Sequence, residues 1–206
     1  MHYIDAIIRG ISSLPTVIIY LFLCIGAFTE NICPPVPGDT IIAFGAFLAG
    51  QNRLNFFIAY LCTTAGSLAG FMFVFWLGLH LGKRFFVDRE YPFFKREDIV
   101  KAEKWLNRYG YLIILINRYI PGIRAVISIT SGILRLSPMK VMIMALLGCA
   151  TWNLLIMYVG LNIGSNWEEI KQRFGHFLAQ YNMTVLALLS CLIIIFFIAK
   201  WIKKRR

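Results

Sequence analysis

The sequence predicts an all-α integral membrane protein: an inverted repeat of a re-entrant helical hairpin plus a transmembrane helix, with an extra C-terminal transmembrane helix. The 206-residue chain is 59% hydrophobic, which is too apolar for a soluble domain of this size. Apolar runs at 56–79, 137–163 and 183–199 each approach or exceed the roughly 20 residues that span hydrocarbon. Two parts of the chain also match at an offset of 82 residues, which indicates an internal duplication.

The polar residues exclude several other classes of protein. The formal net charge of +11 is concentrated between the apolar runs and at the C-terminus, where basic residues set membrane topology, so we expect no nucleic-acid partner. The five cysteines are scattered, and the three histidines have no companions at ligand spacing. We therefore expect no disulfide framework, metal site or cofactor. The N-terminus lacks a basic region followed by a cleavage site, so we expect no removable signal peptide.

The duplication rests on glycines and turn residues that recur in the same order. Each repeat has an apolar segment, a Pro-Gly break, a short apolar segment, a turn containing arginine and a full span. The pairs are Pro37-Gly38/Pro121-Gly122, Gly50/Gly132, Arg53/Arg135, Leu54/Leu136, Gly66/Gly148, Gly78/Gly160, Leu79/Leu161 and Gly82/Gly164, with Trp76 opposite Tyr158. The glycines in the spans are expected to allow close helix packing.

The first repeat, about 14–82, begins with a hairpin at about 14–50. Its arm at 39–49 gives roughly 16 Å of helix, too short for about 30 Å of hydrocarbon. Irregular backbone at membrane depth is tolerated where protein or a water-filled cavity covers it, so we expect a re-entrant loop. Its tip consists of Pro34, Pro35, Pro37 and Gly38. A rival layout makes 14–30 a complete span with the N-terminus inside.

The second repeat, about 111–164, has a hairpin at about 111–135. Its arm at 111–120 gives roughly 15 Å of helix, and its tip is Pro121-Gly122. The following span is expected at 138–163. An extracytoplasmic segment at 165–180 and a C-terminal transmembrane helix at 181–202 complete a single membrane domain over 1–206.

The topology follows from the lysines and arginines. Segment 83–110 carries eight of them and is therefore expected in the cytoplasm. Under that arrangement fifteen basic residues lie inside and four outside, and the C-terminus is cytoplasmic. Within this segment, 98–109 has one apolar helical face and is expected to lie along the membrane interface or to form a soluble linker helix. Asp98 is a candidate N-cap and Gly110 a C-terminal stop.

Four charged residues flank the two predicted tips. Glu30 and Asp39 lie on either side of the first break, and Arg118 and Arg124 on either side of the second. If both tips reach the midplane, two carboxylates face two guanidiniums. Ionisable groups inside a membrane are costly and mark transport pathways by default. The structural alternative is a closed set of ion pairs that clamps the hairpins together.

The chemistry of this set suits an anionic headgroup. Arginine pairs bidentately with phosphate and stays protonated, and the helix that follows Pro121-Gly122 presents free N–H groups at its N-terminus. Arg118 and Arg124 are therefore the candidate phosphate-binding residues. Glu30 and Asp39 can take up protons, because burial favours the neutral acid while neighbouring arginine favours the carboxylate. Protonated acids would release the arginines for phosphate, which would couple phosphate movement to protons.

Two motifs resemble those of the DedA family of membrane proteins. "ENICPPVPGD" is similar to the first family motif and "NRYIPGIR" to the second, and the resemblance covers about residues 14–165. It implies a multi-pass protein of the bacterial cytoplasmic membrane that moves polyprenyl-phosphate carrier lipid or phospholipid between leaflets, with proton-motive force involved. It also implies that Glu30 and Asp39 match the essential acids of the family, and Arg118 and Arg124 its essential arginines.

Two positions depart from the pattern of this family. Many relatives carry an acid after the glycine that matches Gly70 and an arginine after the one that matches Gly78. Here these positions are Phe71 and Leu79. Whatever role those polar groups play in relatives is therefore in doubt for this chain.

The leading hypothesis is therefore a flippase-like transporter that returns undecaprenyl phosphate for recycling. Phospholipid flipping or scrambling, proton-coupled export of small cations or drugs, and a purely structural role are the alternatives. A lipid phosphatase is disfavoured, because "PGIR" lacks the serine of the PG-x-S-R-S signature and no histidine is near the arginines in sequence. The sequence does not determine the oligomeric state.

Overall fold

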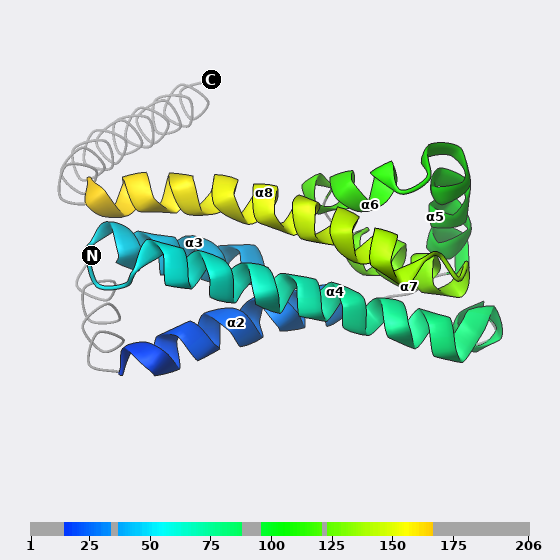
Figure 1. Cartoon of the computed structure of the whole chain (residues 1–206), viewed down its shortest axis with the longest axis horizontal. Coiled ribbons are helices and arrows are strands. Elements are labelled where there is room, and N and C mark those ends of the chain that lie inside the picture. The colour runs from blue at the N-terminus through cyan, green and yellow to red at the C-terminus, as the bar shows by residue number, and fades with distance from the viewer. Residues whose placement is uncertain (1–14, 34–36, 88–95, 121–122, 167–206) are drawn as a thin grey trace, which may run out of the picture. The chain divides into compact units, whose positions relative to one another are not determined.

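The computed structural model describes residues 15–33, 37–87, 96–120 and 123–166 (Figure 1). The chain divides into two units, 1–165 and 166–206, and the described helices all belong to the first. The predicted C-terminal helix 181–202 and nearly all of the predicted segment 165–180 lie outside the described residues.

The described part of the chain is helical. Its elements are α2 (Thr16–Ile32), α3 (Gly38–Gly50), α4 (Phe56–Val87), α5 (Arg96–Tyr109), α6 (Leu112–Ile116), the 3₁₀ helix η1 (Asn117–Tyr119), α7 (Arg124–Ile133) and α8 (Pro138–Ser165). Within these residues, Phe56–Gly82 and Pro138–Ser165 are long and apolar enough to cross a membrane, at 27 and 28 residues. The two helical spans predicted in this region are confirmed.

The two long helices run side by side in opposite directions (Figure 1). The first helix pair, α2 and α3, lies at the end where α4 begins. The second helix pair, α6–η1 and α7, lies at the end where α4 finishes and α8 begins. Helix α2 ends and α3 begins toward the middle of the bundle, as do the end of η1 and the start of α7.

Each helix pair contacts both long helices. Helix α2 packs along α4 and its partner α3 along α8, whereas α6 packs along α8 and its partner α7 along α4. The α6 arm changes to a 3₁₀ turn at Asn117, and Ile120 is extended. A residue that precedes proline is disfavoured in the helical conformation, so the predicted arm at 111–120 loses its last helical turn.

Glycines in the long helices permit these contacts at backbone distance. A Cβ atom at Gly66 of α4 would lie against the carbonyl oxygen of Cys24 in α2. A Cβ atom at Gly148 of α8, 82 positions later, would lie against that of Leu115 in α6. Small residues that bring helix backbones together are typical of membrane bundles. The predicted packing role of these glycines is confirmed.

A second pair of glycines repeats the arrangement on the other arms. A Cβ atom at Gly78 of α4 would collide with the carbonyl oxygen of Ile129 in α7. At Gly160 of α8 it would lie 2.7 Å from that of Ala43 in α3. The prediction is wrong at Gly82, where a Cβ atom would have no neighbour within 4 Å and the backbone instead adopts φ +70° at a kink in α4.

The two long helices also begin in the same way. The backbone N–H of Asn55 donates to the hydroxyl of Tyr20 at 2.8 Å, and that of Ser137 to the hydroxyl of Tyr111 at 3.2 Å. Asn55 and Ser137 are again 82 residues apart. In both places a tyrosine from the first arm of a helix pair fixes the entry of a long helix.

Helix α5 packs its apolar face onto the bundle. Ile99, Ala102 and Leu106 are buried in a core that α4, α6, α7 and α8 share. The face predicted to meet a membrane surface or solvent therefore contacts protein instead. The helix starts at Arg96, so Asp98 lies in its first turn and is not the N-cap. Gly110, at φ +58°, ends the helix as predicted.

Replacing Gly66 with alanine is expected to lower the free energy of unfolding by about 1–3 kcal/mol, because the added methyl group forces α2 away from α4. Denaturant titration of the detergent-solubilised protein measures this change. Leu61→Ala on the same helix is the control, since Leu61 is exposed and its loss should change stability by about 0.5 kcal/mol or less. Equal stability of Gly66→Ala and the native chain would show that the α2–α4 contact is loose.

Candidate functional site

The inner ends of the two helix pairs carry the charged side chains. Glu30 lies in the last turn of α2, Asp39 in the first turn of α3, Arg118 in η1 and Arg124 at the first residue of α7. All four stand next to the breaks that interrupt otherwise apolar helices. The structure brings them into one cluster, which we call the charged cluster.

Arg124 lies between the two acids. Its guanidinium donates to Glu30 Oε1 through one terminal nitrogen and to Asp39 Oδ2, at 2.6 Å, through the other. The second nitrogen also donates to the backbone carbonyl of Arg118 at 3.1 Å. The planar fork of arginine suits such two-sided pairing with oxygen anions. One residue of the second helix pair thereby holds both acids of the first.

Arg118 is held differently, mainly by neutral groups. Its side chain is 2% exposed, and its guanidinium donates to Asn31 Oδ1 at 2.9 Å and to Ser67 Oγ at 2.8 Å. Its carboxylate partner is Glu30, at 3.6 Å, an ion-pair distance longer than a hydrogen bond. Arg118 therefore fills a fixed, fully enclosed position beneath the cluster.

A buried polar network supports Arg118 from the long helices. Asn31 donates to the carbonyl of Ala27 and accepts from Arg118, so its amide is oriented from both sides. Asn153 of α8, fully buried, donates to Ser67 and Thr64 of α4 at 3.4 Å each. The hydrogen bonds thus connect α2, α4, η1 and α8 around one guanidinium.

Trp152 of α8 borders the open edge of the cluster. Its indole N–H donates to Asp39 Oδ1 at 2.9 Å, and its ring lies 5.6 Å from the guanidinium carbon of Arg124. Tyr119 packs edge-on against the same ring at 5.1 Å and donates to Thr151 at 2.9 Å. Such a cation–π contact favours the arginine in this place without neutralising it.

Exposure differs across the cluster. The side chain of Asp39 is 33% exposed and that of Glu30 only 8%. Glu30 Oε2 and the Nε atoms of both arginines have no hydrogen-bond partner among the described residues. The cluster is therefore enclosed around Arg118 and Glu30 and open beside Asp39 and Trp152.

Comparison with known proteins identifies the family of this chain. A model of the VTT domain matches residues 36–162. The chain belongs to the VTT-domain (DedA) family. The resemblance inferred from the two sequence motifs is thereby confirmed, and the protein is a membrane protein.

Several relatives share most of their length with this VTT-domain chain. "Undecaprenyl phosphate transporter A" of Bacillus subtilis is 28% identical, with 88% of each chain covered. The protein of the same name from Staphylococcus aureus is 22% identical over 91% of this chain and 92% of its own. An "Alkaline phosphatase-like protein" of Lactococcus lactis subsp. cremoris is 32% identical over 85% and 83%. No solved structure matches the chain.

The tip residues of this VTT-domain protein are described in part. Pro37 is the N-cap of α3 and Gly38 its first residue. A Cβ atom at Gly38 would lie 2.5 Å from Glu30 Oε2, so glycine is needed there for α3 to begin against that carboxylate. Pro34, Pro35, Pro121 and Gly122 lie outside the described residues. Across the described ranges, no group of three or more His, Cys, Asp or Glu side chains could hold a metal ion.

The two positions at which the chain departs from many VTT-domain relatives are used for packing. Phe71 is buried in the core, and its carbonyl accepts from Ser128 Oγ of α7 at 2.5 Å. Leu79 packs against the same core. Both side chains therefore contribute to the hydrophobic core.

Sequence reasoning missed three members of the site, Asn31, Ser67 and Trp152. Each is a polar or amphipathic residue within an apolar helix, and that placement was the available signal. Asn31 adjoins Glu30 directly, and Ser67 adjoins Gly66. The positions of the partner helices were needed to show that they point at the two arginines.

Proposed function

We propose that the protein carries undecaprenyl phosphate between the leaflets of the bacterial cytoplasmic membrane for recycling, coupled to proton movement. The observation that carries this proposal is the pairing of Arg124 with two acids, Glu30 and Asp39, at the ends of the interrupted helices. The side chain of Arg124 is 13% exposed, and both of its partners can take up a proton. The names of the Bacillus and Staphylococcus relatives support the choice of lipid.

The proposal includes two re-entrant hairpins related by an inverted repeat. At 1.5 Å per residue, α2, α3 and α7 are about 26, 20 and 15 Å long, less than the roughly 30 Å of hydrocarbon. The helix pairs approach from opposite ends of α4 and α8, and the glycine contacts repeat at an offset of 82 residues. Inverted repeats with broken helices at the midplane are common among secondary transporters. The basic segment 83–110 and the C-terminus are assigned to the cytoplasm.

In the proposed cycle, the two carboxylates and the lipid phosphate compete for the same arginine, and protonation of the carboxylates favours the phosphate. Protonation of Asp39 and Glu30 removes the charges that hold Arg124. The lipid phosphate then takes their place, joined by the free N–H groups at the start of α7. Deprotonation restores the pairs with Arg124 and expels the phosphate on the other side. The headgroup passes the cluster while the hydrocarbon chain stays in the bilayer.

The two arginines have unequal roles in this scheme. Arg124 offers the phosphate its exposed fork beside Asp39. Arg118 adds positive charge from its enclosed position, and its bonds to Asn31 and Ser67 keep it from following the headgroup. Glu30 contacts both arginines, so protonation of its carboxylate would weaken both ion pairs together.

Neutralising the acids is expected to uncouple transport from the pH gradient. In proteoliposomes a gradient of about one pH unit should accumulate undecaprenyl phosphate about tenfold on one leaflet for each coupled proton. Glu30→Gln and Asp39→Asn should remove that accumulation, because neither amide titrates. Leaflet-specific chemical labelling of the lipid measures the distribution. Glu103→Gln, on α5 away from the cluster, is the control, and gradient-driven accumulation by both tip variants would contradict proton coupling through these acids.

A second candidate, a lipid phosphatase, is favoured by the names of two Lactococcus relatives at 32% and 33% identity. It is tested in the same vesicles by measuring inorganic phosphate released from undecaprenyl phosphate or its diphosphate. Release by the native chain that Arg124→Ala abolishes would favour hydrolysis. The same vesicles loaded with labelled phospholipid or with a small organic cation test the two remaining transport alternatives.

A further inference from the structure

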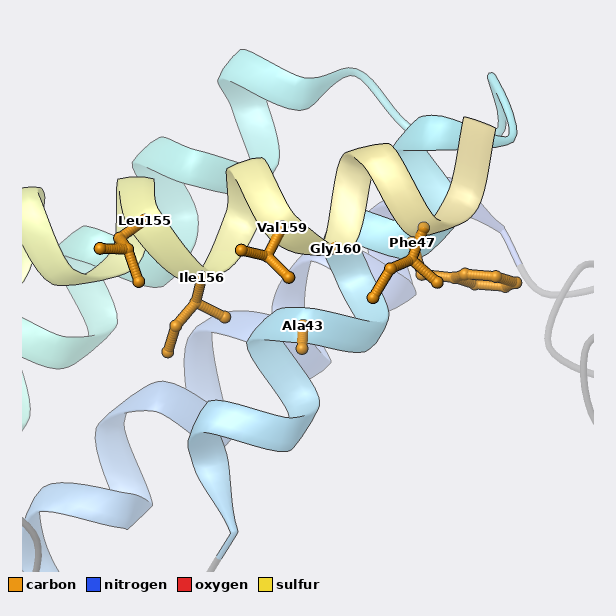
Figure 2. A pocket seen from close by; sticks show the side chains of 7 residues that line it. Ala43, Phe47, Leu155, Ile156, Val159 and Gly160 are labelled. Carbon is orange, nitrogen blue, oxygen red and sulfur yellow. The ribbon is translucent and has the colours of Figure 1, made fainter. Parts of the chain in front are cut away.

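An apolar groove lies between α3 and α8 (Figure 2). Its volume is about 300 Å³, at the lower end of the range for ligand pockets. In Figure 2 the side chains of α8 reach across the seam toward those of α3. The floor is formed by Ala43, Phe47 and Gly160, and the rim by Leu155, Val159 and Ile163. We call it the α3–α8 groove.

The groove is open along one side. Leu155 and Val159 of the rim are each 52% exposed, whereas Phe47 and Gly160 of the floor are buried. The lining residues are all apolar. Rim residues four apart follow one face of α8, so the groove extends along that helix for about 12 Å.

The α3–α8 groove continues from the open edge of the charged cluster. Asp39 and Ala43 are four residues apart in α3, and Trp152 precedes Leu155 by three residues in α8. Residues at these spacings lie on one helix face. The bond from Trp152 to Asp39 closes the top of the same seam. An anion that replaced Asp39 at Arg124 would therefore have an apolar path directly beneath it.

We infer, on the basis of the proposed function, that the α3–α8 groove binds the phosphate-proximal part of the polyprenyl chain while the phosphate is at Arg124. The ligand and the protein are complementary from end to end. The anionic head meets guanidinium and helix N-terminus, and the uncharged chain meets an apolar slot. Because the chain leaves lipid that is equally apolar, the slot adds affinity through close van der Waals packing.

The geometry favours a single-chain lipid. A polyprenyl phosphate has one hydrocarbon chain, and the two helices enclose one slot. A glycerophospholipid brings two chains, of which the slot could hold one. At the floor, Gly160 packs against the carbonyl of Ala43, so the open part of the slot lies beside the exposed side chains of Leu155 and Val159.

The test compares Leu155→Trp with Leu154→Trp in the full-length protein. Leu155 lines the groove and Leu154 does not, yet they are neighbours of the same type and similar exposure, at 52% and 48%. The probe is a polyprenyl phosphate with a photoreactive group in its first isoprene unit, reconstituted into vesicles and mapped by mass spectrometry. A probe with the same group in a phospholipid acyl chain is the second arm. Val159→Trp repeats the groove variant in case Leu155→Trp does not fold.

We expect the polyprenyl probe to label 43–47 and 155–163 in the native chain and in Leu154→Trp. The groove variants should lower that labelling about tenfold, because the added indole ring fills the slot and removes the van der Waals contacts of the chain. Binding of a short-chain prenyl phosphate should stay unchanged in all of them, because it needs only the headgroup site.

Four results would overturn the inference. Two concern the position of the label: labelling outside the groove, and labelling of residues 167–206 or of a second copy that fills the slot. The other two are labelling that the groove variants leave unchanged and equal labelling by the phospholipid probe. Failure of the proposed function looks different. In that case labelling of the groove would persist while leaflet exchange of undecaprenyl phosphate was absent. Exchange without groove labelling would instead leave the transport proposal standing and refute the groove.

Discussion

Replacing Arg124 with alanine is expected to slow exchange of undecaprenyl phosphate about thirtyfold to several-thousandfold. Truncating one member of a buried, hydrogen-bonded charge pair costs about 2–5 kcal/mol of binding, and each 1.4 kcal/mol is tenfold. The loss should be large because Arg124 is the residue through which both Glu30 and Asp39 contact the second helix pair most closely. Leaflet exchange in proteoliposomes, with protein insertion checked in the same sample, measures the effect.

Two further variants separate charge from geometry at this position. Arg124→Lys keeps a cation but loses the fork, so exchange should fall to a value between those of the native and alanine proteins. Arg108→Ala, on the exposed surface of α5, removes a positive charge elsewhere and should leave exchange unchanged. Native-like exchange by Arg124→Ala would mean that phosphate does not pass this guanidinium, and the transport site would have to be sought elsewhere.

Replacing Arg118 with leucine is expected to lower the free energy of unfolding by about 3–5 kcal/mol, because it leaves buried partners of a charge uncompensated. Asn31 Oδ1 and Ser67 Oγ would lose the hydrogen bonds that they accept from Arg118. Glu30 would keep Arg124 as its remaining ion-pair partner among the described residues. Denaturant titration in mixed micelles measures the stability. Asn31→Leu removes the bonds to Arg118 and to the carbonyl of Ala27 and leaves a buried donor nitrogen of Arg118 unpaired, while Glu30 keeps both arginines, so a smaller loss of about 1–3 kcal/mol is expected.

The same experiment distinguishes a positioning role from direct contact with substrate. Arg108→Leu is the matched control and should change stability by about 0.5 kcal/mol or less. If Arg118→Leu were as stable as the native chain yet lost exchange, Arg118 would act on the phosphate itself. If stability fell and exchange per correctly folded molecule persisted, the side chain would serve the fold alone. Our proposal expects both to fall, with stability more affected than in Arg124→Ala.

Much of the architecture was predictable because apolar length and glycine spacing are properties of the sequence. The long helices at Phe56–Gly82 and Pro138–Ser165 follow from uninterrupted hydrophobic runs. The contact of Glu30 and Asp39 with Arg124 follows from placing both breaks at the same depth. Those inferences need only the number of residues between features and no knowledge of helix rotation.

The remaining features depend on rotation and on local backbone geometry. Which face of α4 points at η1 decides whether Ser67 or a neighbour meets Arg118, and the apolar composition of α4 leaves that open. The indole of Trp152 bonds Asp39 because α3 packs mainly on α8 and much less on α4. Gly82 has the sequence context of the packing glycines, yet its positive φ places it at a kink.

The crossed contacts of the helix pairs have a mechanical consequence. Helices α2 and α7 pack mainly on α4, whereas α3 and α6 pack mainly on α8, so each of these two groups contains one arm from each pair. The bond from Arg124 to Glu30 lies inside the first group, and the bond from Trp152 to Asp39 inside the second. The bond from Arg124 to Asp39 joins the groups. A small shear between the groups would therefore strain this bond, whereas the two bonds inside the groups would stay intact.

Asn153 of α8 also joins the groups through its bonds to Thr64 and Ser67 of α4, and Arg118 is a further tie between them. It stands on η1, which packs on α8, and its bonds to Asn31 and Ser67 reach helices of the other group. Because the bonds of Arg118 are buried and the Arg124–Asp39 bond is partly exposed, we expect the bonds of Arg118 to be the stronger. Under the proposed function, a lipid headgroup would break the Arg124–Asp39 bond, and the bonds of Arg118 would limit how far the two groups slide past each other.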